Sequence, residues 1–122
     1  MRTLDALILL GYSVGMSFGQ VLFKISADRA KAGVADGAFW QTLIRTPAFY
    51  LSLVTYAALT LLWIWILSRI ELSKAYPFVA FSFVTTPLIA ALLFRESLNP
   101  WYFMSLTMIL GGLALLMWKG VA

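Results

Sequence analysis

The chain has 122 residues, of which 62% are hydrophobic and only 11% charged, and its mean hydropathy is +0.91. Soluble domains are about half apolar and about a quarter charged, so this composition excludes a soluble domain and indicates an integral membrane protein. The formal net charge of +4 does not point to nucleic acid, because basic residues at the edges of membrane spans are ordinary.

Four apolar segments have the length of a membrane-spanning helix, about 20 residues. They lie at about residues 4–27, 48–67, 75–94 and 101–118. Aromatic residues near the span ends are typical of interfacial anchors: Tyr50, Trp63, Trp65, Trp101, Tyr102 and Trp118. The first segment is too long for a cleaved signal peptide and lacks a small-residue cleavage pattern. We therefore predict an all-α integral membrane protein, with residues 1–122 forming a single four-helix transmembrane domain.

The first span carries glycines at a helical repeat. Gly11, Gly15 and Gly19 recur every four residues and so fall on one face of the helix. In lipid, a face of small residues lets another helix approach closely, which favours a role in helix packing. Thr107 and Gly111 have the same spacing in the fourth span and predict a second packing contact, within the chain or between subunits.

A polar stripe follows a neighbouring face of the same span. It consists of Ser13, Ser17, Gln20 and Lys24, at steps of four, three and four residues. Hydrocarbon solvates such groups poorly, so the stripe must face protein or water. Lys24 lies about 5 Å from the expected end of the span, where its ammonium can simply extend to the membrane surface. The unbroken stripe below it favours the other reading, in which Lys24 binds an anionic headgroup.

The loop at residues 28–47 is the one substantial loop, and residues 36–47 within it predict a short helix along the membrane surface. Asp36 is the expected N-cap, and Pro47 opens the second span. The apolar face of this helix consists of Phe39, Trp40, Leu43 and Ile44. An interfacial anchor is the favoured interpretation, and a lid for a lipid is the alternative.

The third span begins with Ala-Tyr76-Pro77 and carries Ser82 and a proline at mid-membrane. Pro87 removes one backbone hydrogen bond and frees the carbonyl of Phe83, which predicts a kink. Such breaks line pathways or act as hinges in transporters. The alternative is that neighbouring hydroxyls satisfy the carbonyl without a functional role.

The residue inventory argues against an enzyme. Cysteine and histidine are absent, which excludes disulfides, thiol chemistry and the usual zinc sites. The five carboxylates lie at or beyond the expected span ends: Asp5, Asp28, Asp36, Glu71 and Glu96. No pairing of nucleophile and base and no phosphate-binding glycine loop can be assembled from the remaining residues. We expect no catalytic residues, cofactor or metal.

The chain resembles four-helix members of the drug/metabolite transporter superfamily, which includes the small multidrug resistance exporters. The resemblance covers nearly the full length and is strongest over residues 71–116, which begin ELSKAYPFVAFSFVTTPLIAALLFRESLNP. It implies a helical bundle that works as a dimer of identical or homologous subunits, with alternating access to a central site.

One departure from the exporters concerns charge in the first helix. Small multidrug exporters carry a membrane-embedded glutamate there, which exchanges protons for cationic drugs. Here that helix has no carboxylate after Asp5, which is too near the terminus, and presents Gln20 and Lys24 instead. A cation without an acid attracts an anion and repels a cationic drug.

The motif GQ-x-x-x-K in the first helix, with Ala-Tyr-Pro in the third, is similar to the flippase subunits for aminoarabinose-phosphoundecaprenol. This resemblance implies functional positions at Gln20, Lys24, Tyr76 and Glu96. We therefore expect a flippase of a polyprenyl-phosphate-linked sugar in the bacterial inner membrane, with Lys24 pairing with the phosphate and Gln20 beside it. Four hydroxyls would contact the sugar: those of Ser13, Ser17, Tyr76 and Ser82.

Two other functions stay open at this stage. One is a proton-coupled exporter of small molecules, in which Glu71 or Glu96 reaches into the membrane. The other is an accessory membrane subunit without transport of its own. The basic residues do not decide orientation, because four lie on each side: Arg2, Arg69, Lys74 and Lys119 against Arg29, Lys31, Arg45 and Arg95. The sequence leaves open the sugar, the energy coupling, and homodimer versus heterodimer in parallel or antiparallel arrangement.

Overall fold

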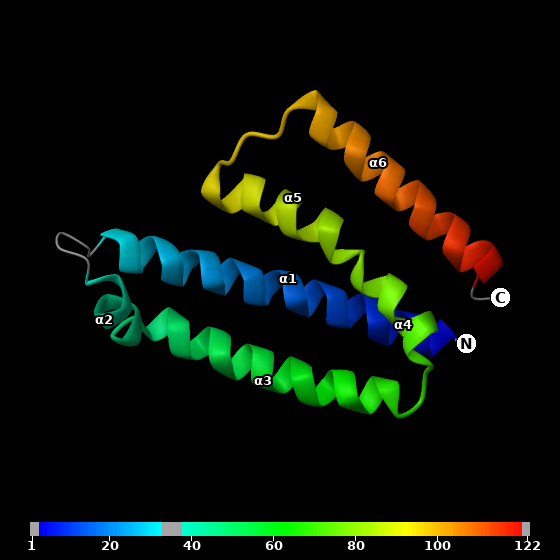
Figure 1. Ribbon diagram of the computed structural model, residues 1–122, viewed down its shortest axis with the longest axis horizontal. Helices are drawn as coiled ribbons and strands as arrows, with labels where there is room; N and C mark the ends of the chain where they lie inside the picture. Colours follow the sequence, from blue (N-terminus) through cyan, green and yellow to red (C-terminus); the bar gives the residue numbers. More distant parts are fainter. Residues whose placement is uncertain (1–2, 33–37, 121–122) are drawn as a thin grey trace.

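The computed structural model describes residues 3–32 and 38–120, and every regular element in these ranges is helical. The elements are α1 (Thr3–Ala32), α2 (Phe39–Ile44), α3 (Pro47–Leu67), α4 (Leu72–Val79), α5 (Ser82–Phe94) and α6 (Pro100–Leu115), which a π-helical turn (Leu116–Gly120) extends (Figure 1). Four segments are long and apolar enough to cross a membrane: Thr3–Ala32, Pro47–Leu67, Leu72–Phe94 and Pro100–Trp118. The predicted all-α membrane fold with four spans is confirmed.

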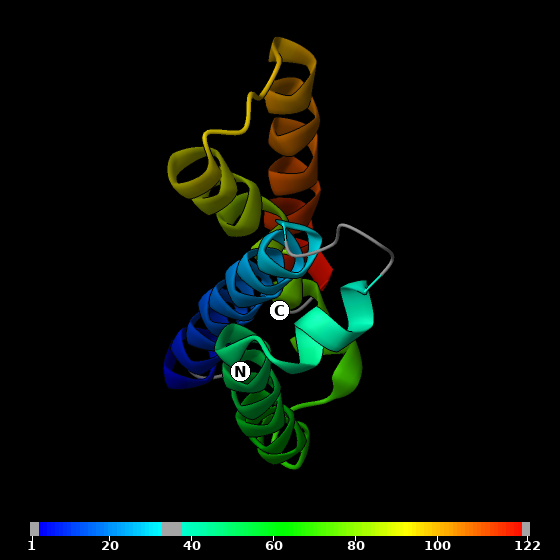
Figure 2. The same ribbon diagram turned by 90° about the vertical axis from the view of Figure 1, so that its left-hand side faces the viewer.

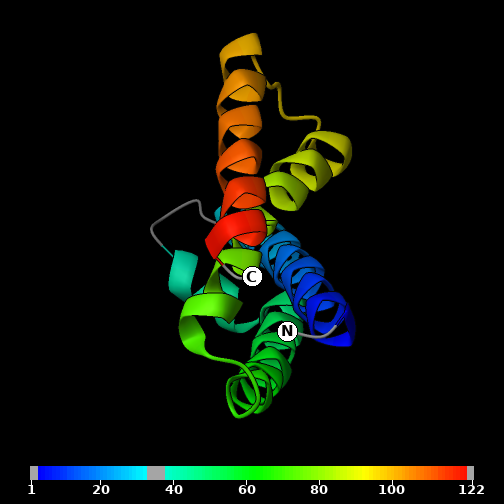
Figure 3. The ribbon, with the colours of Figure 1, turned by 90° about the vertical axis from the view of Figure 1, so that its right-hand side faces the viewer.

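The first helix lies at the centre of the bundle. It packs against α3 on one side and against α4 and α5 on the other (Figure 1). Figures 2 and 3 show the order α3, α1, α5 and α6 across the molecule, with α6 outermost. The first turn of α1 and the last turn of α6 lie at the same end of the bundle, as an even number of spans requires.

The contact between α1 and α3 uses two of the three glycines. A Cβ atom on Gly19 would lie only 2.5 Å from Cε2 of Tyr56, and one on Gly15 would lie 3.0 Å from a methyl of Leu59. The Tyr56 ring also stacks on Phe23, with 4.6 Å between the ring centroids. Gly11 has open space around it, with nothing within 4 Å of a Cβ at that position. The closest approach of the two helices therefore lies at Gly15 and Gly19.

The small residues of the fourth span face outward. Thr107 is exposed and donates its hydroxyl hydrogen bond to the Phe103 carbonyl of its own helix, at 2.9 Å. Gly111 has nothing within 4 Å of a Cβ built on it. In the part of the chain that the structure describes, this pair contacts no other helix, so a packing role requires a second subunit.

The third span is interrupted at Ala80 and Phe81, which separate α4 from α5. Ser82 donates a 2.7 Å hydrogen bond to the Val79 carbonyl and so satisfies an acceptor at the end of α4. Pro87, the expected hinge, lies inside α5, where the helix continues past it. The change of direction in this span thus comes nearly two turns before the proline.

The loop helix α2 is shorter than the predicted segment, which spans residues 36–47. It begins after Ala38, whose side chain makes no cap, and Trp40 within it is 72% exposed. Asp36, the expected N-cap, lies outside the described residues. The exposed indole fits the predicted interfacial anchor.

Buried serines join α1 to both halves of the interrupted span. The Ser13 and Ser17 side chains are completely buried. Ser13 donates a 2.6 Å hydrogen bond to the Phe78 carbonyl in α4, while the Ser17 hydroxyl bonds that of Thr85 and accepts a 2.9 Å bond from Thr86 in α5. Both serines are expected to contact the substrate, but the structure places them in a packed junction. Their hydroxyls are already bonded there to the Phe78 carbonyl and to the hydroxyls of Thr85 and Thr86.

The glycine contact predicts a position-specific effect of a single methyl group. We expect Gly19→Ala to destabilise the protein by about 1 to 3 kcal/mol, because the Tyr56 ring, held by Phe23, must shift. Gly11→Ala is the matched control and should be neutral or slightly stabilising, because its site is open and alanine favours helix. Thermal unfolding of both variants in detergent micelles measures the difference. Equal unfolding temperatures for the two would contradict the α1–α3 contact.

The serine junction predicts a loss of stability on removing one hydroxyl. We expect Ser17→Ala to cost about 1 kcal/mol, because interhelical hydrogen bonds in membranes contribute about 0.6 to 2 kcal/mol. Ser52→Ala is the control: Ser52 is equally buried, but its hydroxyl bonds the Phe49 carbonyl of its own helix. In unfolding by denaturing detergent, Ser17→Ala should be less stable than Ser52→Ala. The reverse order would contradict a stabilising role for the bonds between Ser17 and the two threonines.

Candidate functional site

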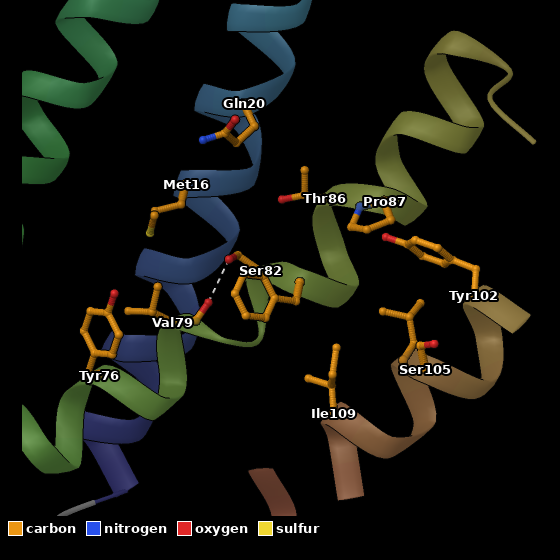
Figure 4. Close-up of a pocket in the computed structure, with 12 residues that line it drawn as sticks. Met16, Gln20, Tyr76, Val79, Ser82, Thr86, Pro87, Tyr102, Ser105 and Ile109 are labelled. Carbon is orange, nitrogen blue, oxygen red and sulfur yellow. Dashed lines mark hydrogen bonds between the residues drawn. The ribbon is translucent and has the colours of Figure 1, made fainter. Parts of the chain in front are cut away.

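A cavity of about 500 Å³ lies between α1, α4, α5 and α6 (Figure 4). Its polar lining comes from six side chains: Gln20, Tyr76, Ser82, Thr86, Tyr102 and Ser105. The remaining lining residues are apolar, such as Met16 and Ile109, and none of the described lining residues carries a charge. Such a combination, mostly apolar with a few polar groups, is typical of a small-molecule site.

The break in the third span shapes one wall of this cavity. Tyr76 lies before the break, in α4, while Ser82 and Thr86 lie after it, in α5. The opposite wall is one face of α6, whose lining residues follow helical spacing: Tyr102, Ser105, Leu106 and Ile109. Figure 4 shows these two walls facing each other across the cavity. Tyr76 and Phe83 are 63% and 57% exposed, so the cavity reaches the surface of the bundle.

The amide of Gln20 is held in a definite orientation. Its Nε2 donates a 2.7 Å hydrogen bond to the Tyr56 hydroxyl, which itself lies 3.4 Å from the Met16 carbonyl. A carbonyl can only accept, so the phenolic proton points to Met16 and the phenolic oxygen accepts from Gln20. This chain of bonds assigns the amide nitrogen to the α3 side and leaves the amide oxygen as an acceptor. The site therefore suits a ligand that brings hydroxyl or ammonium donors.

Lys24 lies outside the cavity lining, one turn beyond Gln20 on α1. Its Nζ is 3.3 Å from a carboxylate oxygen of Asp28, and the two side chains are 47% and 50% exposed. The expectation of a cation without an acid in the first helix is therefore wrong, because α1 continues to Ala32 and brings Asp28 one turn beyond Lys24. Half-exposed pairs contribute only about 0 to 1 kcal/mol, so the ammonium can exchange its carboxylate for a phosphate.

The predicted site residues therefore divide into two groups. Gln20, Tyr76 and Ser82 line the cavity, whereas Ser13, Ser17, Lys24 and Glu96 do not. Glu96 is exposed in the connection between α5 and α6.

Three further polar lining residues escaped the sequence analysis: Thr86, Tyr102 and Ser105. The signal that could have identified two of them is the spacing of Tyr102 and Ser105 on one face of the fourth span. Position near a span end favoured an anchoring role for Tyr102 instead.

Comparison with known proteins yields curated relatives over nearly the full length. The probable 4-amino-4-deoxy-L-arabinose-phosphoundecaprenol flippase subunit ArnE of Pseudomonas aeruginosa (strain LESB58) is 32% identical over 113 residues, which cover 93% of this chain and 96% of that protein. The protein of the same name from Pseudomonas paraeruginosa (strain DSM 24068 / PA7) is 31% identical with the same coverage. That of Pseudomonas fluorescens (strain Pf0-1) is 32% identical over 98 residues, or 80% of this chain and 83% of the relative.

No protein-family model and no solved structure matches the chain. The curated relatives nevertheless cover 80% to 93% of the chain, and identity above 30% over this length is that of homologues. The four helices that can span a membrane and the similarity to flippase subunits identify the chain as a multi-pass membrane protein. The chain belongs to the ArnE family of flippase subunits.

Proposed function

We propose that this chain is a subunit of a flippase that moves a polyprenyl-phosphate-linked sugar across the bacterial inner membrane. The observation that carries the proposal is the uncharged cavity inside the bundle, mostly apolar but lined by six polar side chains, with Lys24 one turn beyond it. The names of the relatives, which specify a 4-amino-4-deoxy-L-arabinose-phosphoundecaprenol substrate, support the same class of lipid.

The size of the cavity limits what enters it. A volume of about 500 Å³ lies within the usual range of about 300 to 1,000 Å³ for small-molecule sites. It accommodates a sugar but not a long polyprenyl chain, which remains in the bilayer. Only the headgroup then needs a polar route, and the exposed Tyr76 and Phe83 leave the cavity open to the lipid at its side.

Each polar group has a distinct role in this proposal. Lys24 releases Asp28 and pairs with the lipid phosphate. The Gln20 amide oxygen accepts a hydrogen bond from a donor on the sugar, because its nitrogen is already bonded to Tyr56. Further hydroxyls contact the sugar from both walls of the cavity: Tyr76, Ser82, Thr86, Tyr102 and Ser105. Glu96 receives no headgroup contact.

A second four-helix subunit completes the transporter. The relatives are named subunits, and α6 is the outermost helix, with only Leu106 buried among its residues. Its outward face includes Thr107 and Gly111, whose small side chains let another helix approach closely. The partner is a second copy or a homologous chain, and α6 supplies the contact.

The phosphate role of Lys24 predicts a selective loss of lipid binding. We expect Lys24→Gln to weaken binding of polyprenyl phosphate about tenfold, because a charge-assisted bond contributes about 1.5 to 3 kcal/mol. Lys31→Gln is the matched control, since it removes a charge at the same end of α1 outside the polar stripe. Native mass spectrometry of the purified protein measures both. Unchanged binding by Lys24→Gln, or stabilisation by cationic drugs that depends on Glu71 or Glu96, would overturn the proposal.

The orientation of Gln20 predicts discrimination between the glycosylated and the bare lipid. We expect Gln20→Ala to weaken binding of the sugar-linked lipid about fivefold, because one neutral hydrogen bond contributes about 1 kcal/mol. Binding of bare polyprenyl phosphate should stay unchanged, whereas Lys24→Gln should weaken both lipids. Tyr56→Phe provides a second variant, since it frees the Gln20 amide to turn. Equal losses for the two lipids in Gln20→Ala would contradict a sugar contact.

A further inference from the structure

A second, smaller cavity lies at the opposite end of the bundle from Lys24. Its volume is about 140 Å³, and its lining consists of Asp5, Arg69, Ile70, Glu71 and Lys74. These residues come from the first turns of α1 and α4 and from the connection between α3 and α4. Four of the five side chains are charged, in contrast to the uncharged lining of the larger cavity.

Lys24 and Lys74 lie toward opposite ends of the bundle. Lys24 follows Asp5 by nineteen residues along α1, which is about 28 Å at a rise of about 1.5 Å per residue. This length matches the hydrocarbon thickness of about 30 Å. Figure 1 shows α4 beside the start of α1, while α2 lies at the other end of the bundle. The larger cavity lies between these two charged ends.

The two ends share one chemical arrangement. Lys74 lies 3.7 Å from a Glu71 carboxylate oxygen, with side chains 42% and 72% exposed, as Lys24 lies 3.3 Å from Asp28. Pairs this exposed are weak, so a phosphate can displace the carboxylate from either lysine.

Arg69 adds a second cation to the smaller cavity. Its guanidinium lies 4.8 Å from the centroid of the Trp65 ring, which holds it at the end of α3. A guanidinium matches the geometry of phosphate oxygens better than an ammonium does. The smaller cavity therefore offers two cations, Arg69 and Lys74, beside two carboxylates, Asp5 and Glu71, with which a phosphate competes.

We propose that Lys74 and Arg69 form a second binding site for the phosphate of the transported lipid, at the membrane face opposite Lys24. The proposal rests on the proposed flippase function. A flipped lipid starts with its phosphate at one face and ends with it at the other, so each face needs a site that binds and releases it. Both cavities draw on the same short helix, because α4 contributes Lys74 to the smaller cavity and Tyr76 to the larger one.

The test is a count of bound lipids. The purified full-length protein, in phosphatidylcholine nanodiscs, is titrated with undecaprenyl phosphate and analysed by native mass spectrometry. We expect two lipids per chain for the wild type, one for Lys24→Gln, one for Lys74→Gln and none for the double variant. Glu71→Gln should tighten the second site severalfold, because it removes the competing carboxylate, and Lys31→Gln should change neither site.

The outcomes separate this proposal from the proposed function. One lipid per chain in the wild type, lost in Lys24→Gln and unchanged in Lys74→Gln, removes the second site and leaves the flippase proposal standing. No binding by the wild type removes both. Equal competition by phosphatidylglycerol shows a general anchor for anionic lipids and overturns the second site. If Lys74→Gln unfolds, the Glu71→Gln variant tests the second site instead. Tighter lipid binding by Glu71→Gln supports the proposal, and unchanged or weaker binding overturns it.

Discussion

The arrangement depends on two buried serine hydroxyls that join the central helix to an interrupted one. In lipid, apolar surfaces do not drive helices together, so hydrogen bonds and close packing must do so. A break in a spanning helix also leaves backbone carbonyls that need a partner. Ser13 bonds the Phe78 carbonyl just before the break, and Ser17 bonds the hydroxyls of Thr85 and Thr86 just after it. These three bonds tie both α4 and α5 to α1, and the two helices together form one wall of the larger cavity.

The other side of α1 determines how the site presents its one amide. Because Gly19 has no side chain, the Tyr56 ring lies directly against α1, stacked on Phe23. From there its hydroxyl accepts from Gln20 and donates to the Met16 carbonyl, so the amide nitrogen is bonded to α3 and the amide oxygen is left as an acceptor. A packing residue and a binding residue are thus coupled through one ring.

The four spans were predictable because length and hydropathy alone determine which segments cross a membrane. The partners of polar side chains were not, since Ser13 bonds a residue 65 positions away. Spacing could not separate Gly11 from Gly19 either, because a step of four residues turns a helix by about 400° and only the neighbouring helix decides which glycine it meets. No residue type at Ala80 predicts the break in the helix there. Pro87 does predict a break, but α5 continues past it.

The distribution of charge distinguishes this bundle from a proton-coupled exporter. Such an exporter needs a carboxylate that meets its substrate inside the membrane, and the described lining of the larger cavity contains none. Glu71 pairs with Lys74 at one membrane face, and Glu96 is exposed in the connection between α5 and α6. A fixed charge at mid-membrane would hold a phosphate tightly and slow its release. The larger cavity has an uncharged lining instead, and the charged side chains lie toward the two ends of the bundle.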